Sequence, residues 1–190
     1  VNRVWMHHFG KGIVASPGDF GQLGSQPTHP ELHDWMAAEF MRTGWSLKQL
    51  HRQIMTSRTY RQASTRDDKR DLIDPDNTLL SRMNVRRLEA ETLRDSLLAI
   101  SGKLNPKVGG VPVPVTQNEE GQVVIGKDTT DTAGRPTGKI IPLNGEEFRR
   151  SIYIQARRSR PLEMFATFDA PIMEPSCDAR SVTTVSPQSL

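Results

Sequence analysis

The feature that most constrains the fold is a pair of helical patterns within residues 28–60, whose two helices are joined by only about three residues around Gly44 and Trp45. Their apolar positions are Leu32, Trp35, Met36 and Phe40 in the first pattern, and Leu47, Leu50 and Ile54 in the second. These positions recur every three or four residues, which gives each helix one apolar face. The short connection makes the two helices turn back on each other, so the sequence predicts an αα-hairpin. Trp45 stands at the corner, where we expect its ring to fill the junction.

The starts and ends of these helices also have sequence signals. Thr28 and Glu31 have the spacing of a capping box, and Ser46 and Gln49 repeat that spacing. Gly44 follows the first pattern, in the position where a glycine commonly ends a helix. We therefore expect side-chain caps at both helix starts.

A third long helix is predicted over residues 84–101, and Gly102 is placed to end it. Its expected apolar side consists of Leu88, Leu93, Leu97 and Ile100. The preceding residues 63–81 are polar and contain the turn sequence DPDN, so a loop is expected there.

The second half of the chain is predicted to hold a small β element within residues 123–156. VVIG (123–126) and KIIPL (139–143) have the composition of short strands, joined as a hairpin across a long polar loop. SIYIQA (151–156) alternates apolar and polar residues and is a third strand candidate. The predicted fold class is α+β and mainly helical, with the αα-hairpin, the third long helix and this β element.

Composition bounds the size and class of the protein. A chain of 190 residues is long enough for one domain or two small ones. No window approaches the roughly 18 to 20 apolar residues of a membrane span, so none is expected. Cys177 is the only cysteine, which excludes an internal disulfide and a CxxCH haem motif. Because the sequence opens without a methionine, we expect residues 1–190 to be a single domain cut from a longer chain.

Residues 149–160 read RRSIYIQARRSR and contain five arginines. Acids follow nearby, which favours a buried or half-buried network of ion pairs; they are Glu163, Asp169, Glu174 and Asp178. The alternative is a ligand cleft, because guanidinium groups suit carboxylate and sulfate groups. A nucleic-acid surface needs uncompensated positive charge, but five arginines stand against six acids between Glu146 and Asp178. Nucleic acid is therefore not an expected partner.

The second helical pattern and the residues after it form another basic region, opposed only by Asp67 and Asp68. An anionic partner is one interpretation of this region, and a solvated helix face is the other. The candidate anion-binding residues of the chain are Lys48, Arg52, Arg58, Arg149, Arg150, Arg157, Arg158 and Arg160.

Two pairs of histidines could suggest a metal site. His29 and His33 are four residues apart on a predicted helix, but no third ligand is evident, so no metal is expected. His7 and His8 are adjacent and point in different directions, so at least one should be a packed, hydrogen-bonded residue. One of them could instead face a cleft.

The sequence does not identify catalytic residues. A glycosidase needs two carboxylates about 5 to 9 Å apart. Five acids lie beside aromatic or arginine residues, namely Asp19, Glu89, Glu91, Asp95 and Asp169. The sequence selects no pair among them.

Six blocks occur in one order along the chain: VNRVWMHHFGKGIVASPGDFG, THPELHDWMAAEF, GWSLKQLHRQIMTSRTYRQAS, RRLEAETLRDSLLAISGKL, RRSIYIQARRSRPLEMFATFDAP and SCDARSVTTVSPQSL. Together they closely resemble the planctomycete-type PSD1 domain, also called DUF1553, a family of uncharacterised function. Residues 110–145 lie outside the resemblance and look like a variable insertion. The chain departs from the family at His33, where an apolar residue is usual, and in TTVSPQSL, where the family has a TNTPLQAL-like run.

The resemblance implies a context rather than a reaction. Members are typically large exported bacterial proteins in which a cytochrome c-like segment precedes this domain. Haem would then belong to an upstream domain, this segment would need no cofactor, and the location would be extracytoplasmic. The family setting also implies bacteria that live on complex, often sulfated, polysaccharides.

Three functions are consistent with these observations. The first is a non-catalytic domain that binds anionic polysaccharide, supported by the two basic regions. The second is a glycan-processing enzyme domain with a carboxylate pair, for which Asp169 and Glu91 are candidates. The third is a structural module that docks the upstream domains of the same chain.

Overall fold

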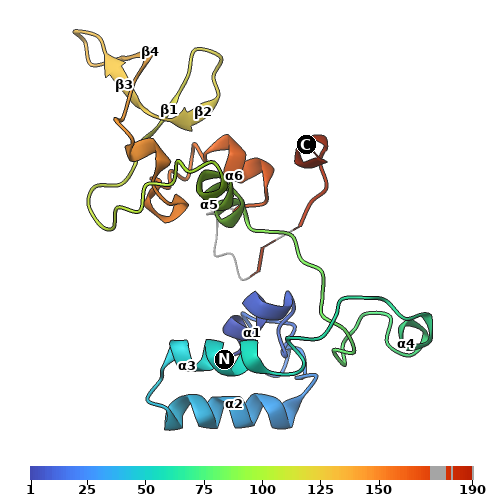
Figure 1. The fold of residues 1–190 in the computed structure, drawn as a ribbon. Coiled ribbons are helices and arrows are strands. Elements are labelled where there is room, and N and C mark those ends of the chain that lie inside the picture. The colour runs from blue at the N-terminus through green and yellow to red at the C-terminus, as the bar shows by residue number, and fades with distance from the viewer. Residues whose placement is uncertain (172–178, 181, 190) are drawn as a thin grey trace. The chain divides into compact units, whose positions relative to one another are not determined.

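The computed structural model describes residues 1–171, 179–180 and 182–189 (Figure 1). The chain divides into two compact units, unit 1 (Val1–Arg87) and unit 2 (Leu88–Leu190). Each unit has its own core and is described by itself.

The described residues form six α-helices and two small antiparallel sheets of two strands each. The helices are α1 (Asn2–Phe9), α2 (Pro30–Arg42), α3 (Leu47–Thr56), α4 (Asp68–Ile73), α5 (Ala90–Ile100) and α6 (Glu163–Thr167). The strands are β1 (Val115–Gln117), β2 (Val123–Ile125), β3 (Lys127–Thr130) and β4 (Pro136–Ile141), and short 3₁₀ turns are η1 (Glu146–Phe148), η2 (Ser151–Tyr153) and η3 (Ser186–Ser189). The fold is therefore mixed α+β, and the expectation of a mainly helical fold is wrong. Glycines and prolines in residues 102–145 keep that region out of helices.

The predicted αα-hairpin is confirmed as α2 and α3, which lie side by side in unit 1 (Figure 1). Ser46 caps α3, since its side chain accepts a hydrogen bond from the backbone N–H of Gln49. The capping box expected at Thr28 is absent from the start of α2, where His29 is the N-cap residue. The Thr28 hydroxyl donates instead to the carbonyl of Ile13, so a tertiary contact replaces the local cap.

The core of unit 1 is apolar and joins α1 to the hairpin. It consists of Trp5, Phe9, Ile13, Met36, Leu50 and Ile54. The rings of Trp5 and Phe9 stack with their centroids 4.2 Å apart. Trp45 does not fill the helix junction as expected: it is 66% exposed and meets Phe40 edge-on.

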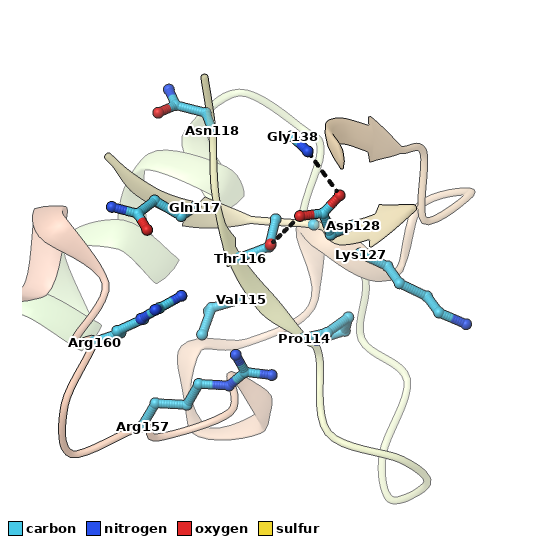
Figure 2. Close-up of a pocket in the computed structure, with 11 residues that line it drawn as sticks. Pro114, Val115, Thr116, Gln117, Asn118, Lys127, Asp128, Gly138, Arg157 and Arg160 are labelled. Carbon is cyan, nitrogen blue, oxygen red and sulfur yellow. Dashed lines mark hydrogen bonds between the residues drawn. The ribbon is translucent and has the colours of Figure 1, made fainter. Parts of the chain in front are cut away.

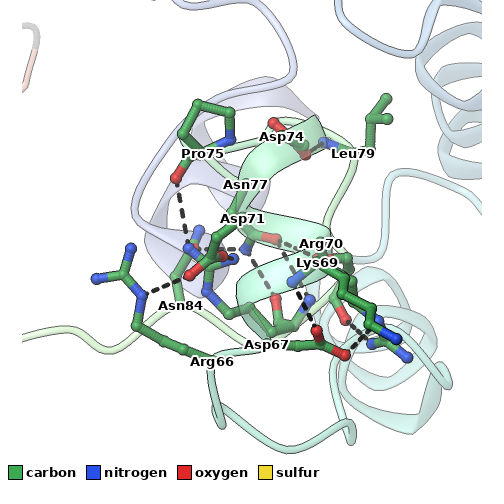
Figure 3. Close-up of polar contacts among 12 residues, drawn as sticks. Arg66, Asp67, Lys69, Arg70, Asp71, Asp74, Pro75, Asn77, Leu79 and Asn84 are labelled. Atoms are coloured by element: carbon green, nitrogen blue, oxygen red, sulfur yellow. Dashed lines mark hydrogen bonds and ion pairs between the residues drawn. The ribbon is translucent and has the colours of Figure 1, made fainter.

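The polar segment after α3 is organised by hydrogen bonds rather than by apolar packing (Figure 3). The carboxylate of Asp71 on α4 accepts from both Arg66 and Arg82. The buried side chain of Asn77 donates to the Arg82 carbonyl and to the Asn84 side chain. These contacts organise the segment around the short helix α4, although its sequence predicted only a loop.

The third long helix starts later than predicted, because its first residues make tertiary contacts. Asn84 donates to the carbonyl of Phe9, and Arg86 donates to the carbonyls of Met6 and His7. These contacts keep residues 84–86 extended, and α5 begins only at Ala90. Gly102 follows its end with φ 68°, as the sequence predicted.

The buried face of α5 is not the expected leucine side. Leu88, Leu97 and Ile100 are exposed, whereas Ala90 and Arg94 are buried. Arg94 donates to the carbonyls of Arg149 and Glu147 at 2.9 and 2.6 Å. Burial lowers the pKa of the Arg94 guanidinium by removing water from the charged group.

The prediction of a strand at 151–156 is wrong, because Ser151–Tyr153 form the 3₁₀ turn η2 and residues 154–156 belong to no strand. The Asp95 carboxylate accepts from both the backbone N–H and the hydroxyl of Ser151, at 2.7 and 2.6 Å. Arg94 also donates to the Ser151 hydroxyl. These bonds from α5 fix a turn, and only a single parallel bridge between Val113 and Ile154 resembles a strand pairing.

The β element is two consecutive hairpins rather than one. The predicted strand VVIG is β2, which pairs with β1 in the register Val115↔Ile125. The predicted strand KIIPL overlaps β4, which pairs with β3 in the register Lys127↔Ile141. Gly126 connects the two hairpins at a close approach, since a Cβ there would lie 2.4 Å from Ile140 Cγ2. Any other residue type would require the Ile140 side chain or the backbone to shift.

The last described residues are attached to unit 2 by polar contacts. The Asp169 carboxylate accepts from the backbone N–H and the hydroxyl of Thr183, at 2.9 and 2.6 Å. Arg180 forms a two-pronged pair with the Glu91 carboxylate. Burial alone would raise the pKa of Glu91, but the hydrogen bonds from Arg180 help to bring it below its ordinary value. Glu174, Cys177 and Asp178, which were named from the sequence, lie outside the described residues.

Candidate functional site

A hollow of about 500 Å³ opens in unit 2 beside the two β-hairpins (Figure 2). Its lining is Pro114, Val115, Thr116, Gln117, Asn118, Gly126, Lys127, Asp128, Gly138, Arg157 and Arg160. Apart from Pro114, Val115 and the two glycines, these side chains are polar or charged. The hollow therefore suits a hydrophilic ligand better than an apolar one.

Strand β1 forms the middle of the hollow and is held from both sides. Val115 is buried, and its strand pairs with β2. Just before β1, the backbone N–H of Val113 donates to the carbonyl of Tyr153, and the Val113 carbonyl accepts from the N–H of Gln155. These hydrogen bonds place Gln155 next to the residues that precede β1. The arginines that follow Gln155 in the sequence, Arg157 and Arg160, therefore reach the hollow beside β1.

Arg157 and Arg160 form one wall of the hollow, where both side chains approach Val115 (Figure 2). The backbone N–H of Arg160 donates to the Arg157 carbonyl, so a turn sets the spacing of the two residues. Arg157 Nε donates to Gln155 at 3.3 Å. No described carboxylate lies within ion-pair distance of either guanidinium, so both charges face solvent and the hollow.

The opposite wall has a single carboxylate, Asp128. It accepts from the backbone N–H of Gly138 at 3.1 Å and from the Thr116 hydroxyl at 3.5 Å. The neighbouring Lys127 side chain extends away from the two arginines (Figure 2). The hollow thus has an arginine side and a carboxylate side with amide and hydroxyl groups between them.

Arg149 has a different role from the arginines of the hollow, because its side chain is fully buried. Its guanidinium donates to the carbonyls of Gly109 and Val111, pairs with Glu146 at 3.2 Å and lies over the Tyr153 ring. Arg149 Nε has no hydrogen-bond partner among the described residues. Arg149 holds the chain together and is not positioned to receive an external anion.

The arginine–carboxylate network expected from the sequence exists, but with different acids. Arg149 pairs with Glu146, and Arg150 lies 3.5 Å from Asp95 on α5. Glu163 forms no ion pair with any described residue, and the carboxylate of Asp169 binds Thr183. The pKa of Glu146 is lowered, mainly by its hydrogen bond from Lys107 and further by Arg149.

The other candidate anion-binding residues do not line this hollow. Lys48, Arg52 and Arg58 belong to unit 1 and are exposed at or just after α3. Arg158 is exposed between the two arginines of the hollow but is not part of its lining. These residues provide matched controls for the arginines that do line it.

The histidines of unit 1 form a pair that the sequence did not predict. His8 Nε2 and His51 Nδ1 share a hydrogen bond of 2.8 Å, and the Tyr60 ring meets His8 edge-on. The pKa of His8 is lowered, chiefly by burial and then by His51, Arg86 and His7. His8 is thus the packed histidine expected of the pair His7 and His8.

The second histidine pair has no metal-site geometry. His29 shares a hydrogen bond with the Thr28 hydroxyl, and His33 faces Asp34 at 3.9 Å. In the part of the chain that the structure describes, no three His, Cys, Asp or Glu side chains gather as metal ligands. A second hollow of about 380 Å³ includes His29 at the start of α2 and has one carboxylate, Glu31.

Comparison with family models matches residues 1–190 to PSD1, described as a protein of unknown function (DUF1553). The chain belongs to the PSD1 family. This result confirms the resemblance seen in the six sequence blocks, and the match covers both compact units of the PSD1 chain. That residues 1–190 form a single domain with an insertion at 110–145 stays a prediction. Neither the comparison with curated proteins nor that with solved structures gives a match.

The sequence identified only Arg157 and Arg160 among the eleven residues that line the hollow in this PSD1 chain. Thr116, Lys127 and Asp128 lie in the segment interpreted as a variable insertion. Strong turn sequences such as NEEG at 118–121 and DTAG at 131–134 mark two hairpins and were the signal that could have located it. None of the described helices has the length and hydrophobicity needed to cross a membrane.

Proposed function

We propose that this PSD1 chain is a non-catalytic domain that binds an anionic polysaccharide through the hollow of unit 2. The anionic group of the sugar would be held by Arg157 and Arg160. The observation that carries this proposal is that both guanidinium groups line one hollow and have no carboxylate partner among the described residues. A guanidinium binds sulfate or carboxylate through paired, charge-assisted hydrogen bonds.

The rest of the lining supports a sugar as the ligand. Thr116, Gln117 and Asn118 offer hydroxyl and amide groups that match the hydroxyl groups of a glycan. Phosphate groups of a nucleic acid are a poorer match, because unit 2 carries no broad excess of positive charge: Leu88–Leu190 holds 12 Lys and Arg against 13 Asp and Glu.

The alternative of a glycan-processing enzyme has less support. Each of the two hollows has one carboxylate in its lining, Asp128 in the first and Glu31 in the second. Both oxygens of Glu91 are bound by Arg180, and Asp169 is bound by Thr183. The two acids favoured from the sequence are therefore engaged in holding the tail of the described chain.

An exposed apolar patch near Trp5 or Leu190 would favour the third function, a structural module that docks the upstream domains. Trp5 is in the core of unit 1 with 6% of its surface exposed, and Leu190 lies outside the described residues. We therefore favour polysaccharide binding over docking of upstream domains. The wider setting, an exported protein with a haem domain upstream, is part of the same proposal. The chain has one cysteine, which does not provide the two of a haem-attachment motif.

The test is binding of the full chain to kappa-carrageenan and to its desulfated backbone, measured by calorimetry across a salt series. From about 10 mM to about 1 M ionic strength the Debye length falls from about 30 to about 3 Å, so binding through exposed arginines should weaken strongly. The double variant Arg157→Gln/Arg160→Gln should lose at least about tenfold in affinity, because two charge-assisted hydrogen-bonding groups are removed.

The controls are Arg158→Gln and the pair Lys48→Gln/Arg52→Gln, which change charge outside the hollow. We expect each control to keep the affinity of the unchanged chain within about twofold at moderate salt. No binding to either polysaccharide at low salt would remove the proposal. Binding lost in the Lys48/Arg52 variant and kept in the Arg157/Arg160 variant would move the site to α3.

A further inference from the structure

We propose that Asp128 makes the hollow selective for a sparsely charged glycan, one in which an anionic sugar is followed by a neutral one. This inference rests on the proposed function of the same hollow. It assigns the two walls to different sugars: Arg157 and Arg160 hold the anionic group, and Asp128 receives hydroxyl groups.

The hydrogen bonds of Asp128 leave acceptor capacity directed at the hollow. A carboxylate has about four lone-pair sites on its two oxygens. Gly138 N–H uses one of them at 3.1 Å, and the Thr116 hydroxyl approaches another at 3.5 Å, near the outer limit of a hydrogen bond. The remaining sites are available to other donors, and a sugar hydroxyl is the donor that a glycan provides.

Nothing described neutralises the charge of Asp128. No described cation lies within ion-pair distance, and the adjacent Lys127 extends away from the arginine wall (Figure 2). Asp128 is also only partly exposed, so water screens its charge incompletely. A second sulfate placed at this wall would face an uncompensated carboxylate at short range.

The backbone explains why the carboxylate stays in this position. Gly138 has φ 80° in β4, a left-handed conformation that glycine adopts without strain, and its N–H points at Asp128. Asp128 itself pairs with Ile140 in the register of the second hairpin. The hydrogen bond from the Gly138 N–H therefore holds the carboxylate at this wall of the hollow. Repulsion of a wrong ligand is a recognised route to specificity.

The experiment compares hexasaccharides of kappa- and iota-carrageenan, which share a backbone and carry one and two sulfates per disaccharide. We expect the unchanged full chain to bind the kappa form more tightly, although counterion release alone would favour the more charged iota form. Asp128→Asn keeps an oxygen that accepts from Gly138 and removes the charge. It should shift the ratio of the two dissociation constants towards the iota form by about tenfold.

Two further variants separate a local effect from a change in net charge. Asp131→Asn removes the same charge from the same hairpin, in a turn outside the hollow, where Asp131 accepts from Ala133 and Arg135. It should leave the ratio unchanged. Asn118→Asp adds a carboxylate inside the hollow and keeps the oxygen that accepts from Gln122, so it should increase the preference for the kappa form.

The outcomes distinguish this inference from the proposed function. If neither hexasaccharide binds the unchanged chain at low salt, both ideas fall. If both bind through Arg157 and Arg160 but Asp128→Asn leaves the ratio unchanged, or shifts it no more than Asp131→Asn does, the selectivity of Asp128 is refuted and polysaccharide binding stands. Circular dichroism of each variant shows whether it is folded, and Asn118→Asp gives an independent result if Asp128→Asn does not fold.

Discussion

The two units of the chain are stabilised in different ways. Unit 1 has an apolar core in which Phe9 and Leu50 are each 1% exposed. In unit 2 the largest fully buried side chain is that of Arg149, and Arg94 occupies the buried face of α5. A helix with a regular leucine pattern can therefore bury a polar side chain instead, when a neighbouring loop offers carbonyl groups as hydrogen-bond acceptors.

The difference also separates a scaffold from a binding surface. A buried guanidinium needs hydrogen-bond acceptors or a charge partner, since an unpaired buried charge is strongly destabilising. Arg149 and Arg94 therefore fix the loops at 109–111 and 147–151, between which β1 and its hairpins emerge. That polar framework places Arg157 and Arg160 beside β1. Among the described residues of unit 1 no arginine is buried.

The largest expected effect is the loss of the buried arginine in unit 2. Arg149→Met should lower the free energy of unfolding of unit 2 by about 3 to 5 kcal/mol, because the carbonyls of Gly109 and Val111 lose their donor. Hydrogen exchange of the amides in unit 2 measures this loss. Arg150→Met is the control, as its side chain is 62% exposed, and should change little. An equal loss of unfolding free energy in the two variants would contradict the assignment of Arg149 to the core of unit 2.

A slightly smaller loss is expected from the apolar core of unit 1. Leu50→Ala should lower the unfolding free energy of that unit by about 3 kcal/mol through lost burial and a cavity. All three tryptophans lie in unit 1, so their fluorescence during urea unfolding reports on it alone. Leu47→Ala on the same helix is 54% exposed and should have little effect. A similar midpoint for both variants would refute the assignment of the core.

A modest effect is expected at the helix cap. Ser46→Ala removes the acceptor for the Gln49 N–H, and should reduce the stability of unit 1 by about 0.5 to 1 kcal/mol. The low end of the usual range applies because the observed bond is long, at 3.4 Å. Thr28→Ala tests the other helix start, where the hydroxyl bonds Ile13 and caps nothing. Helix content measured by circular dichroism should fall more in the Ser46 variant, and the reverse order would contradict the observed caps.

The smallest effect concerns pH. Because the folded pKa of His8 lies below its ordinary value of 6.5, the unfolded chain binds more protons in mildly acidic solution. The stability gained by burying the neutral His8 ring is therefore present above about pH 6.5 and is lost as the pH falls below it. We expect the tryptophan-detected melting temperature to fall between pH 7 and pH 5, and to fall less in His8→Gln. An identical pH dependence in that variant would show that His8 is not responsible.

The sequence predicted unit 1 better than unit 2 for a physical reason. Met36, Leu50 and Ile54 follow a helical period and are buried as that period requires, and Leu32 and Phe40 are partly buried. Trp35 and Leu47, which were expected on the same apolar faces, are exposed. In α5 the leucines at 93 and 97 follow the same kind of period, but the hydrogen bonds of Arg94 decide which face is buried. Its partners lie 53 to 57 residues later in the sequence, so no local pattern reveals them. SIYIQA became a turn for the same reason, because Asp95 binds Ser151.

The candidate site was also only partly accessible from the sequence. Arg157 and Arg160 could be proposed as anion-binding residues because they are arginines. The same reasoning also selects Arg149, Arg150 and Arg158, which do not line the hollow. Which of these arginines line the hollow is decided by tertiary structure, namely by the burial of each side chain and by the bridge between Val113 and Ile154. Asp128 gave no signal of its own, since a lone acid in a polar hairpin is commonplace.

The most direct test of the account is nuclear magnetic resonance of the full chain titrated with a kappa-carrageenan hexasaccharide. We expect the largest shifts at the backbone amides of Val115–Asn118 and Lys127–Asp128 and at the guanidinium groups of Arg157 and Arg160. The amides of α3 around Lys48 and Arg52 should stay unchanged. Shifts concentrated on α3, or spread evenly over the basic residues of both units, would contradict a binding site in the hollow of unit 2.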